Sequence, residues 1–139
     1  MIELKWSPSF DIGVEEIDTA HRKLFAMANE IRQAIGGKDP ELSRTRVEAF
    51  IAAAHRHFSE EEKFLDDVGY AESRQHKAYH ALLLDKAERL KQACDEKMDG
   101  DEAEGCYGEV MTFLIDDVVR GDHRFKSYLE HKGLTRPKK

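Results

Sequence analysis

Apolar residues recur every three or four positions in four stretches of the chain, and this spacing predicts four helices. Asp18 can cap the first helix, which stops at the Gly36-Gly37 pair, and Pro40 suits the first turn of the second. No stretch of the chain alternates apolar and polar residues in the manner of a β-strand. The helices are predicted over residues 18–35, 40–68, 72–98 and 101–120, with a short helical piece reaching residue 130.

Short connections between the predicted helices indicate how they pack. Helices joined by a few residues lie antiparallel to their neighbours in up-down bundles. Pro8 and Gly13 favour an extended arm before the first helix. We therefore expect an all-α protein, an antiparallel up-down four-helix bundle with an extended N-terminal arm and a short C-terminal helix. It forms a single domain, with the arm over residues 1–17, the bundle over 18–130 and a tail over 131–139.

Charge and composition narrow the possible partners. The chain of 139 residues carries a formal net charge of −6, and only the terminal RPKK is a basic cluster. This argues against a nucleic-acid partner, which needs clustered lysine and arginine. No apolar run approaches the roughly 20 residues that span a membrane, and the N-terminus has no secretory signal. We expect a cytoplasmic monomer.

The two cysteines, Cys94 and Cys106, are placed symmetrically about Gly100. A helical hairpin that turns at this glycine would bring them near each other. Neighbouring helix axes lie roughly 8–10 Å apart, which is wide for a disulfide, and the cytosol is reducing. We expect buried, unpaired cysteines and treat a functional thiol pair as the alternative.

Ionisable residues interrupt each of the predicted apolar stripes. Buried charges without partners cost several kcal/mol, so these groups need a common partner. His57 and Glu61 are four residues apart, and so are His76 and His80. This spacing places the two members of each pair on the same face of their helix. Imidazoles and carboxylates inside a bundle are the ligands of iron, manganese or zinc. The residues concerned are His21, His57, Glu61, His76, His80 and Asp117.

Two adjacent aspartates near the end of the chain face opposite sides of the fourth predicted helix. Asp116 shares a polar row with Arg120, four residues later, and is expected to form a solvated salt bridge worth about 0.5 kcal/mol. Asp117 lies on the apolar face. Of the other histidines, His55, His123 and His131 are expected outside the centre.

Two other kinds of metal site do not match the spacing. A zincin needs HExxH, but the residues from His76 to His80 contain no glutamate. Carboxylate di-iron proteins of the ferritin type need Glu-x-x-His, and no histidine of this chain has glutamate three residues before it. The predicted site is rich in histidine and has few carboxylates.

The sequence resembles the bacterial hemerythrins over nearly its whole length. The matching residues are Trp6, Phe10, Gly13, Ile17, Asp18, His21 and Leu24 near the N-terminus, His57, Phe58, Glu61 and Glu62 in the second helix, and Gly69, Tyr70, His76 and His80 around the start of the third.

This resemblance implies a centre of two non-heme iron ions with a bridging oxo or hydroxo group. His21 and His57 would bind one iron, His76 and His80 the other, while Glu61 and Asp122 would bridge them. The implied function is binding of O2 for storage, delivery or sensing, rather than enzyme catalysis. Related ligands would be nitric oxide, peroxide and azide.

The fourth helix departs from the family pattern. Asp117 stands where the family has a fifth histidine, and Asp122, five residues later, matches the bridging aspartate. Residues five apart point about 140° from each other on a regular helix, so a π-type turn near Gly121 is needed to bring both inward. A carboxylate ligand favours ferric iron, so we expect faster autoxidation. The alternatives are an oxidase-like, peroxidase-like or nitric-oxide-processing centre, or a redox sensor acting on a partner in trans.

Overall fold

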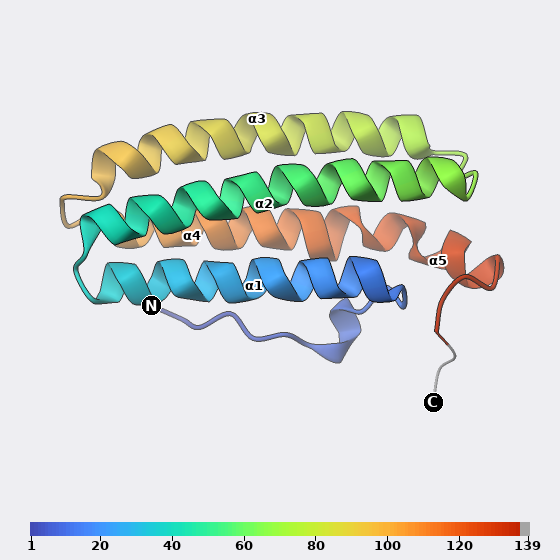
Figure 1. The fold of residues 1–139 in the computed structure, drawn as a ribbon, viewed down its shortest axis with the longest axis horizontal. Coiled ribbons are helices and arrows are strands. Elements are labelled where there is room, and N and C mark those ends of the chain that lie inside the picture. Colours follow the sequence, from blue (N-terminus) through green and yellow to red (C-terminus); the bar gives the residue numbers. More distant parts are fainter. Residues whose placement is uncertain (137–139) are drawn as a thin grey trace.

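Four long helices run side by side in an up-down arrangement (Figure 1). The computed structural model describes residues 1–136, and it contains no strand among them. Each helix is antiparallel to the next along the chain, so the predicted bundle is confirmed. The helices are α1 (Glu15–Gly36), α2 (Pro40–Asp67), α3 (Ser73–Lys97) and α4 (Ala103–Leu114).

The predicted fourth helix is not regular along its length. After α4 the chain forms a π-helix, η2 (Ile115–Gly121), and then the short helix α5 (His123–His131) at one end of the bundle (Figure 1). The amide of Asp122 donates to the carbonyl of Asp117 at 2.8 Å, a bond spanning five residues. The predicted π-type turn is therefore confirmed, and it extends over seven residues.

A tyrosine from α3 packs closely against the π-helix. The hydroxyl of Tyr79 donates to the backbone carbonyl of Asp116 at 2.8 Å. A Cβ atom at Gly121 would lie 2.6 Å from the Tyr79 ring and 3.2 Å from the same Asp116 carbonyl oxygen. Glycine is therefore required at this position by the approach of the tyrosine.

Replacing Gly121 with alanine is expected to destabilise the protein by about 2 kcal/mol, because the Tyr79 ring must move away from the π-helix. Chemical denaturation of the metal-free protein measures the change. Gly108→Ala is the matched control, since a Cβ atom there meets nothing within 4 Å and alanine favours the helix. Equal stability of the two variants would contradict this role of Gly121.

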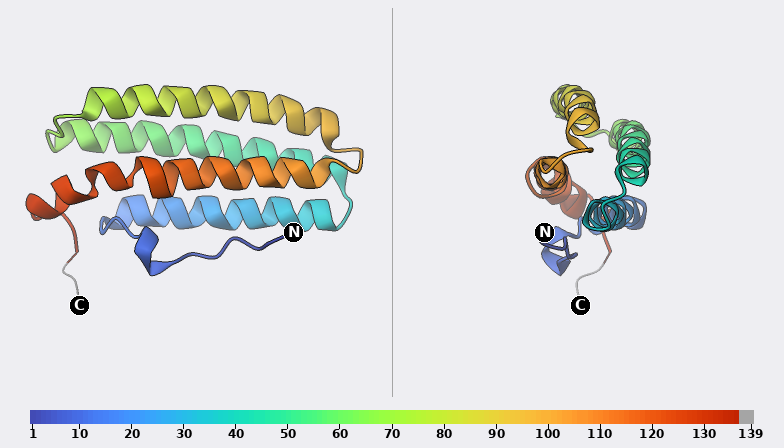
Figure 2. Two further views of the ribbon diagram at one scale, coloured as in Figure 1. Left: turned by 180° about the vertical axis from the view of Figure 1, so that it is seen from behind. Right: turned by 90° about the vertical axis from the view of Figure 1, so that its left-hand side faces the viewer.

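The N-terminal arm runs along α1 (Figure 2) and is held by aromatic and backbone contacts. Trp6 packs edge-on against Phe10 and Phe25, with ring centroids 5.6 and 5.1 Å away. The backbone of Leu4 exchanges two hydrogen bonds with the side chain of Asn29. The arm therefore covers apolar surface of the bundle, and Trp6 packs against that surface.

The predicted cap of the first helix was wrong. The helix α1 begins at Glu15, and Asp18 is fully buried in its first turn. Its carboxylate accepts from the amides of Ile12 and Gly13 at 2.7 and 3.1 Å and from Arg136 at 2.6 Å. Asp18 therefore fastens the arm and the C-terminal segment to α1, a role that its position before an apolar stripe does not reveal.

The expectation of unpaired cysteines was also wrong. Cys94 and Cys106 form a disulfide between α3 and α4, with Cα atoms 5.2 Å apart. The helices converge near their connecting turn, and both side chains point inward, which brings the Cα atoms within disulfide range.

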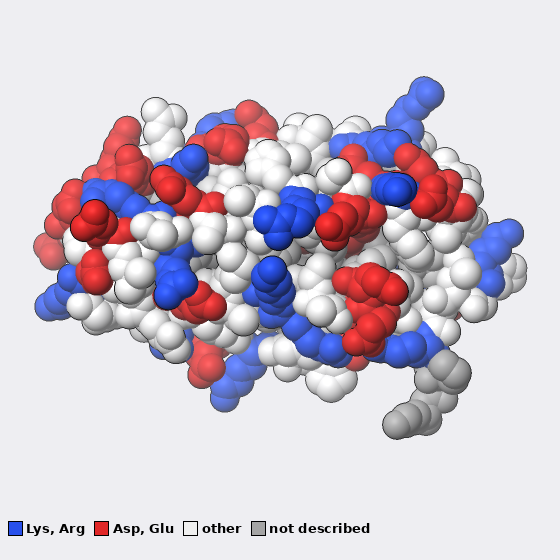
Figure 3. Space-filling view, viewed as in Figure 1, with Lys and Arg blue, Asp and Glu red and all other residues white. Residues whose placement is uncertain are grey.

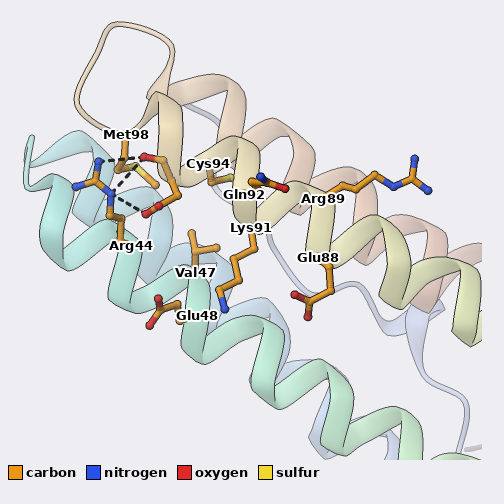
Figure 4. A pocket seen from close by; sticks show the side chains of 10 residues that line it. Arg44, Val47, Glu48, Glu88, Arg89, Lys91, Gln92, Cys94 and Met98 are labelled. Carbon is orange, nitrogen blue, oxygen red and sulfur yellow. Dashed lines mark hydrogen bonds and ion pairs between the residues drawn. The ribbon is translucent and has the colours of Figure 1, made fainter.

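Cys94 also lines a cavity of about 410 Å³ between α2 and α3, surrounded by side chains of both charges (Figure 4).

Charged side chains of both signs cover the outside of the bundle. On the face drawn in Figure 3, lysine and arginine are interspersed with aspartate and glutamate, and neither sign forms an extended patch. Within residues 1–136, every helix is too short or too polar to cross a membrane.

The interior contains two apolar clusters separated along the bundle axis. On α1, Leu24 belongs to the larger cluster and Ile17 to the smaller one near α5. On α2, Phe58 and Leu65 are divided in the same way. On α1, His21 lies about one helical turn from both Ile17 and Leu24, and on α2, Glu61 lies about one turn from both Phe58 and Leu65. A layer of ionisable side chains therefore separates the two clusters. That layer contains the candidate metal centre.

Candidate metal centre

The layer between the two apolar clusters is built from seven ionisable side chains. Each has at most 5% of its surface exposed. They come from α1, α2, α3 and the π-helix with the residue that follows it. These are the seven residues that the sequence indicates: His21, His57, Glu61, His76, His80, Asp117 and Asp122.

Local helix geometry aims these side chains at one another. His57 and Glu61 are four residues apart on α2, so both lie on its inner face. His76 and His80 have the same spacing on α3. The wider π-helical turn brings Asp117 and Asp122 inward together, and both are fully buried.

The seven side chains form two overlapping groups, in each of which the potential ligand atoms lie within 4.8 Å of one another. Asp122 belongs to both groups. Each group therefore offers two imidazoles and two carboxylates. The first comprises His21, His57, Asp117 and Asp122, and the second Glu61, His76, His80 and Asp122.

Two carboxylates lie between the groups. Asp122 places Oδ2 at 2.7 Å from His21 Nε2 and Oδ1 at 3.1 Å from His76 Nε2. Glu61 places Oε2 at 3.1 Å from His57 Nε2 and Oε1 at 2.9 Å from His76 Nε2. Each carboxylate thus directs one oxygen to each group, which is the geometry of a bridging ligand.

Asp117 lies between the groups but is associated more closely with the first. Its oxygens are 3.9 Å from His57 Nε2 and 4.0 Å from His80 Nε2. These distances are nearly equal, but Asp117 shares a group with His21 and His57 and not with His76. Both of its carboxylate oxygens are buried without a hydrogen-bond partner among residues 1–136, as are both ring nitrogens of His80.

Other polar atoms of the centre also lack hydrogen-bond partners within residues 1–136. These atoms are buried, and such groups normally find a partner because an unsatisfied one costs about 1–3 kcal/mol. Shared metal ions would satisfy oxygen and nitrogen atoms together, so this donor set fits metal. The atoms include His57 Nε2, His80 Nε2, Glu61 Oε2 and Asp122 Oδ1.

Mutual electrostatics shift the pKa values of these groups. Burial opposes charge on the histidines, but the carboxylates of Asp122 and Glu61 outweigh it and raise the pKa of His76 to about 9 and of His80 to about 10. Burial and the neighbouring Asp122 raise the pKa of Asp117 to about 7. The four surrounding histidines hold the pKa of Asp122 well below its ordinary value despite burial.

The raised pKa of Asp117 predicts how the metal-free protein responds to pH. Because the folded state holds this proton up to about pH 7 and the unfolded state releases it near 3.8, stability falls as pH rises between these values. Asp117→Asn is expected to remove this loss, so its stability relative to the wild type should rise between pH 5 and pH 8, by on the order of 3 kcal/mol. Denaturation at pH 5 and pH 8 measures it, and a gain that did not grow with pH would contradict the assignment.

Aromatic rings hold the second group in place. The Phe58 ring stacks on His80 with centroids 4.0 Å apart and planes within 4°. Phe125 meets His76 edge-on at 5.1 Å. These rings fix the orientation of both imidazoles and cover them from water. The sequence gives no signal for these two contacts, since each joins residues far apart along the chain.

The remaining candidates lie outside the centre, as expected. Asp116 pairs with Arg120 at 3.1 Å on the surface, and His55 lies 3.3 Å from Glu88. His123 Nε2 lies 3.4 Å from the carbonyl oxygen of Phe10. Glu62, which matches the family pattern but has no ligand role in it, comes within 3.6 Å of His80 Nδ1.

The sequence matches the model of a known protein family over the region that contains the centre. The model of the hemerythrin HHE cation binding domain matches residues 12–125, which include all seven side chains. The chain belongs to the hemerythrin family. The description of the family refers to cation binding, which agrees with the donor set in the interior of this hemerythrin domain.

Relatives of known name are similar over most of the domain. A bacteriohemerythrin from Pseudomonas aeruginosa strain LESB58 is 29% identical over 132 residues, which cover 94% of this chain and 84% of the relative. One from Clostridium acetobutylicum is 32% identical over 87 residues, covering 60% and 67%. A hemerythrin-like protein from Naegleria gruberi is 23% identical over 124 residues, covering 89% and 92%. The similarity thus extends well beyond the metal-binding motifs.

Proposed function

We propose that the centre holds two non-heme iron ions and binds O2 for storage, delivery or sensing, in a monomeric cytoplasmic protein. Membership of the hemerythrin family supports a di-iron protein. The single observation that carries the proposal is the overlap of two ligand groups through Asp122, since two ions that share a carboxylate lie close together. The proposal includes a bridging oxo or hydroxo group.

Each side chain of the centre has a role in this proposal. His21 and His57 hold one ion, while His76 and His80 hold the other. Glu61 and Asp122 bridge the two, because each directs an oxygen toward both groups. The irons, when bound, supply the electrons and the coordination position for O2. Phe58 and Phe125 exclude water around the histidines of the second group.

Asp117 is proposed as a direct or water-mediated ligand of the ion held by His21 and His57. It lies with these two residues in one ligand group, and neither of its buried oxygens makes a hydrogen bond among the described residues. A carboxylate adds negative charge where the family pattern has a neutral imidazole. Negative ligands stabilise ferric over ferrous iron, which favours loss of the O2-binding state.

Anaerobic reconstitution tests the proposed function. Metal-free protein is loaded with two equivalents of ferrous iron, exposed to air and then purged with argon, while the visible spectrum is recorded. A band that appears with air and disappears on purging supports reversible O2 binding. Failure to bind two equivalents of iron overturns the proposal, and so does a spectrum that never responds to O2.

A second candidate function is favoured by the carboxylate at position 117. An oxidation-prone centre suits turnover of O2, peroxide or nitric oxide, or redox sensing on a partner protein in trans. Rapid conversion to a stable ferric spectrum, together with peroxide consumption absent from the metal-free protein, would favour the enzyme. A partner captured only by the reduced or only by the oxidised form would favour the sensor.

A further inference from the structure

The metal centre is enclosed differently on its two sides. Toward α3 and α5, the rings of Phe58 and Phe125 lie against His80 and His76. Phe113 adds a third ring, stacked at 6.0 Å on Phe58. Toward α1 and α2, by contrast, cavities lead inward to His57 and Glu61. Small molecules therefore meet least obstruction between α1 and α2.

Two cavities lie one above the other along the groove between α1 and α2. The first, of about 320 Å³, reaches both His57 and Glu61, and the second, of about 230 Å³, reaches His57 from the next helical turn. Glu60 lines both cavities and is exposed to solvent. His57 and Glu60 thus form the wall that the cavities share.

The linings of the two cavities differ in charge. The first is lined by Val14, Ile17 and Phe64, with Glu16 joining Glu60. Its side chains suit neutral diatomic molecules and cations. The second is lined by Lys23 and Arg56, with the small residues Ala20 and Ala53 leaving the space open. Basic side chains there favour small anions.

We infer that metal ions and small ligands reach the centre between α1 and α2, and that Glu60 selects among them by charge. The inference rests on the proposed iron centre and adds its access route. Glu60 is a specificity-determining residue here and not a ligand, because Glu61, the next residue, already occupies the buried position. A negative charge on the shared wall attracts incoming cations, repels anions and leaves neutral diatomic molecules unaffected.

Charge reversal at Glu60 tests the selection directly. In Glu60→Lys, azide binding to the iron-loaded protein should become about fivefold faster at low salt, with the effect reduced at high salt. Cobalt(II) uptake by the metal-free protein should slow by a similar factor, and nitric oxide binding should not change. Glu96→Lys is the control, because it makes the same change in net charge at an exposed position of α3.

Blocking the cavities tests the route itself. Ala20→Trp and Phe64→Trp, combined, place indole rings in the two cavities and should slow azide, nitric oxide and cobalt(II) alike by about tenfold. The exposed Ala81→Trp on α3 lines neither cavity and should leave all three rates unchanged. Circular dichroism and the final amount of cobalt bound show whether each variant is folded with an intact centre.

The results separate this inference from the proposed function. If the wild-type protein bound neither cobalt nor iron, the proposed centre itself would be wrong. If it bound both, and the blocked variant reached the same cobalt stoichiometry at an unchanged rate, the access route would be wrong. Parallel changes in azide and cobalt rates in Glu60→Lys would overturn selection by charge.

Discussion

Replacing Asp122 with asparagine is expected to weaken binding of both metal ions by at least about 100-fold. Asp122 belongs to both ligand groups and approaches His21 at 2.7 Å and His76 at 3.1 Å through different oxygens. Asparagine keeps the shape but offers one neutral oxygen and an amide nitrogen that repels cations. Loss of residues that only orient ligands already costs 10- to 100-fold, so loss of a shared ligand costs more.

Titration with ferrous iron or cobalt(II) measures this change. Asp116→Asn is the matched control, because it makes the same substitution on the surface, where Asp116 pairs with Arg120, and it should bind metal as the wild type does. Binding of one ion with wild-type affinity by Asp122→Asn would show that the aspartate serves a single ion. Two ions bound normally would exclude it from the centre.

Autoxidation is expected to become roughly tenfold slower when Asp117 is replaced with histidine, equivalent to about 1.4 kcal/mol in activation free energy. The substitution removes a negative charge beside the His21 and His57 group and supplies a neutral imidazole. Ferrous iron is then stabilised relative to ferric iron. Stopped-flow absorbance after mixing the reduced protein with O2 gives the rate.

A second substitution separates charge from ligand type. Asp117→Asn removes the charge without adding an imidazole, so it should slow autoxidation only partly if both properties matter. Metal content must be measured for each variant, since histidine is longer than the buried aspartate that it replaces. Oxidation of the Asp117→His variant at the wild-type rate or faster would overturn the role assigned to this aspartate.

Most of the helical framework could be predicted from the sequence because its signals are local. Pro40 marks the first residue of α2, and its last residue, Asp67, lies two positions before Gly69. The i,i+4 spacing of His57 with Glu61 and of His76 with His80 placed both pairs on inner faces. The π-helix could be anticipated because Asp117 and Asp122 cannot both face inward on a regular helix.

Features that depend on contacts between distant segments could not be predicted. Asp18 has the composition of a cap, but its partners include Arg136, 118 residues away. The Cys94–Cys106 disulfide depends on how closely α3 and α4 converge, and the typical distance between helix axes is larger than the separation of the two Cα atoms here. The Tyr79 contact that requires glycine at position 121 also joins two helices. In each case the controlling distance is set by tertiary packing and not by local sequence.

In the proposed centre, seven buried side chains hold two iron ions. Anomalous diffraction at the iron edge from crystals of the anaerobically loaded protein tests it most directly. We expect two peaks of similar height between α1, α2, α3 and η2, with Asp122 beside both and Asp117 beside the peak that His21 and His57 share. One peak, or peaks elsewhere in the bundle, would contradict it.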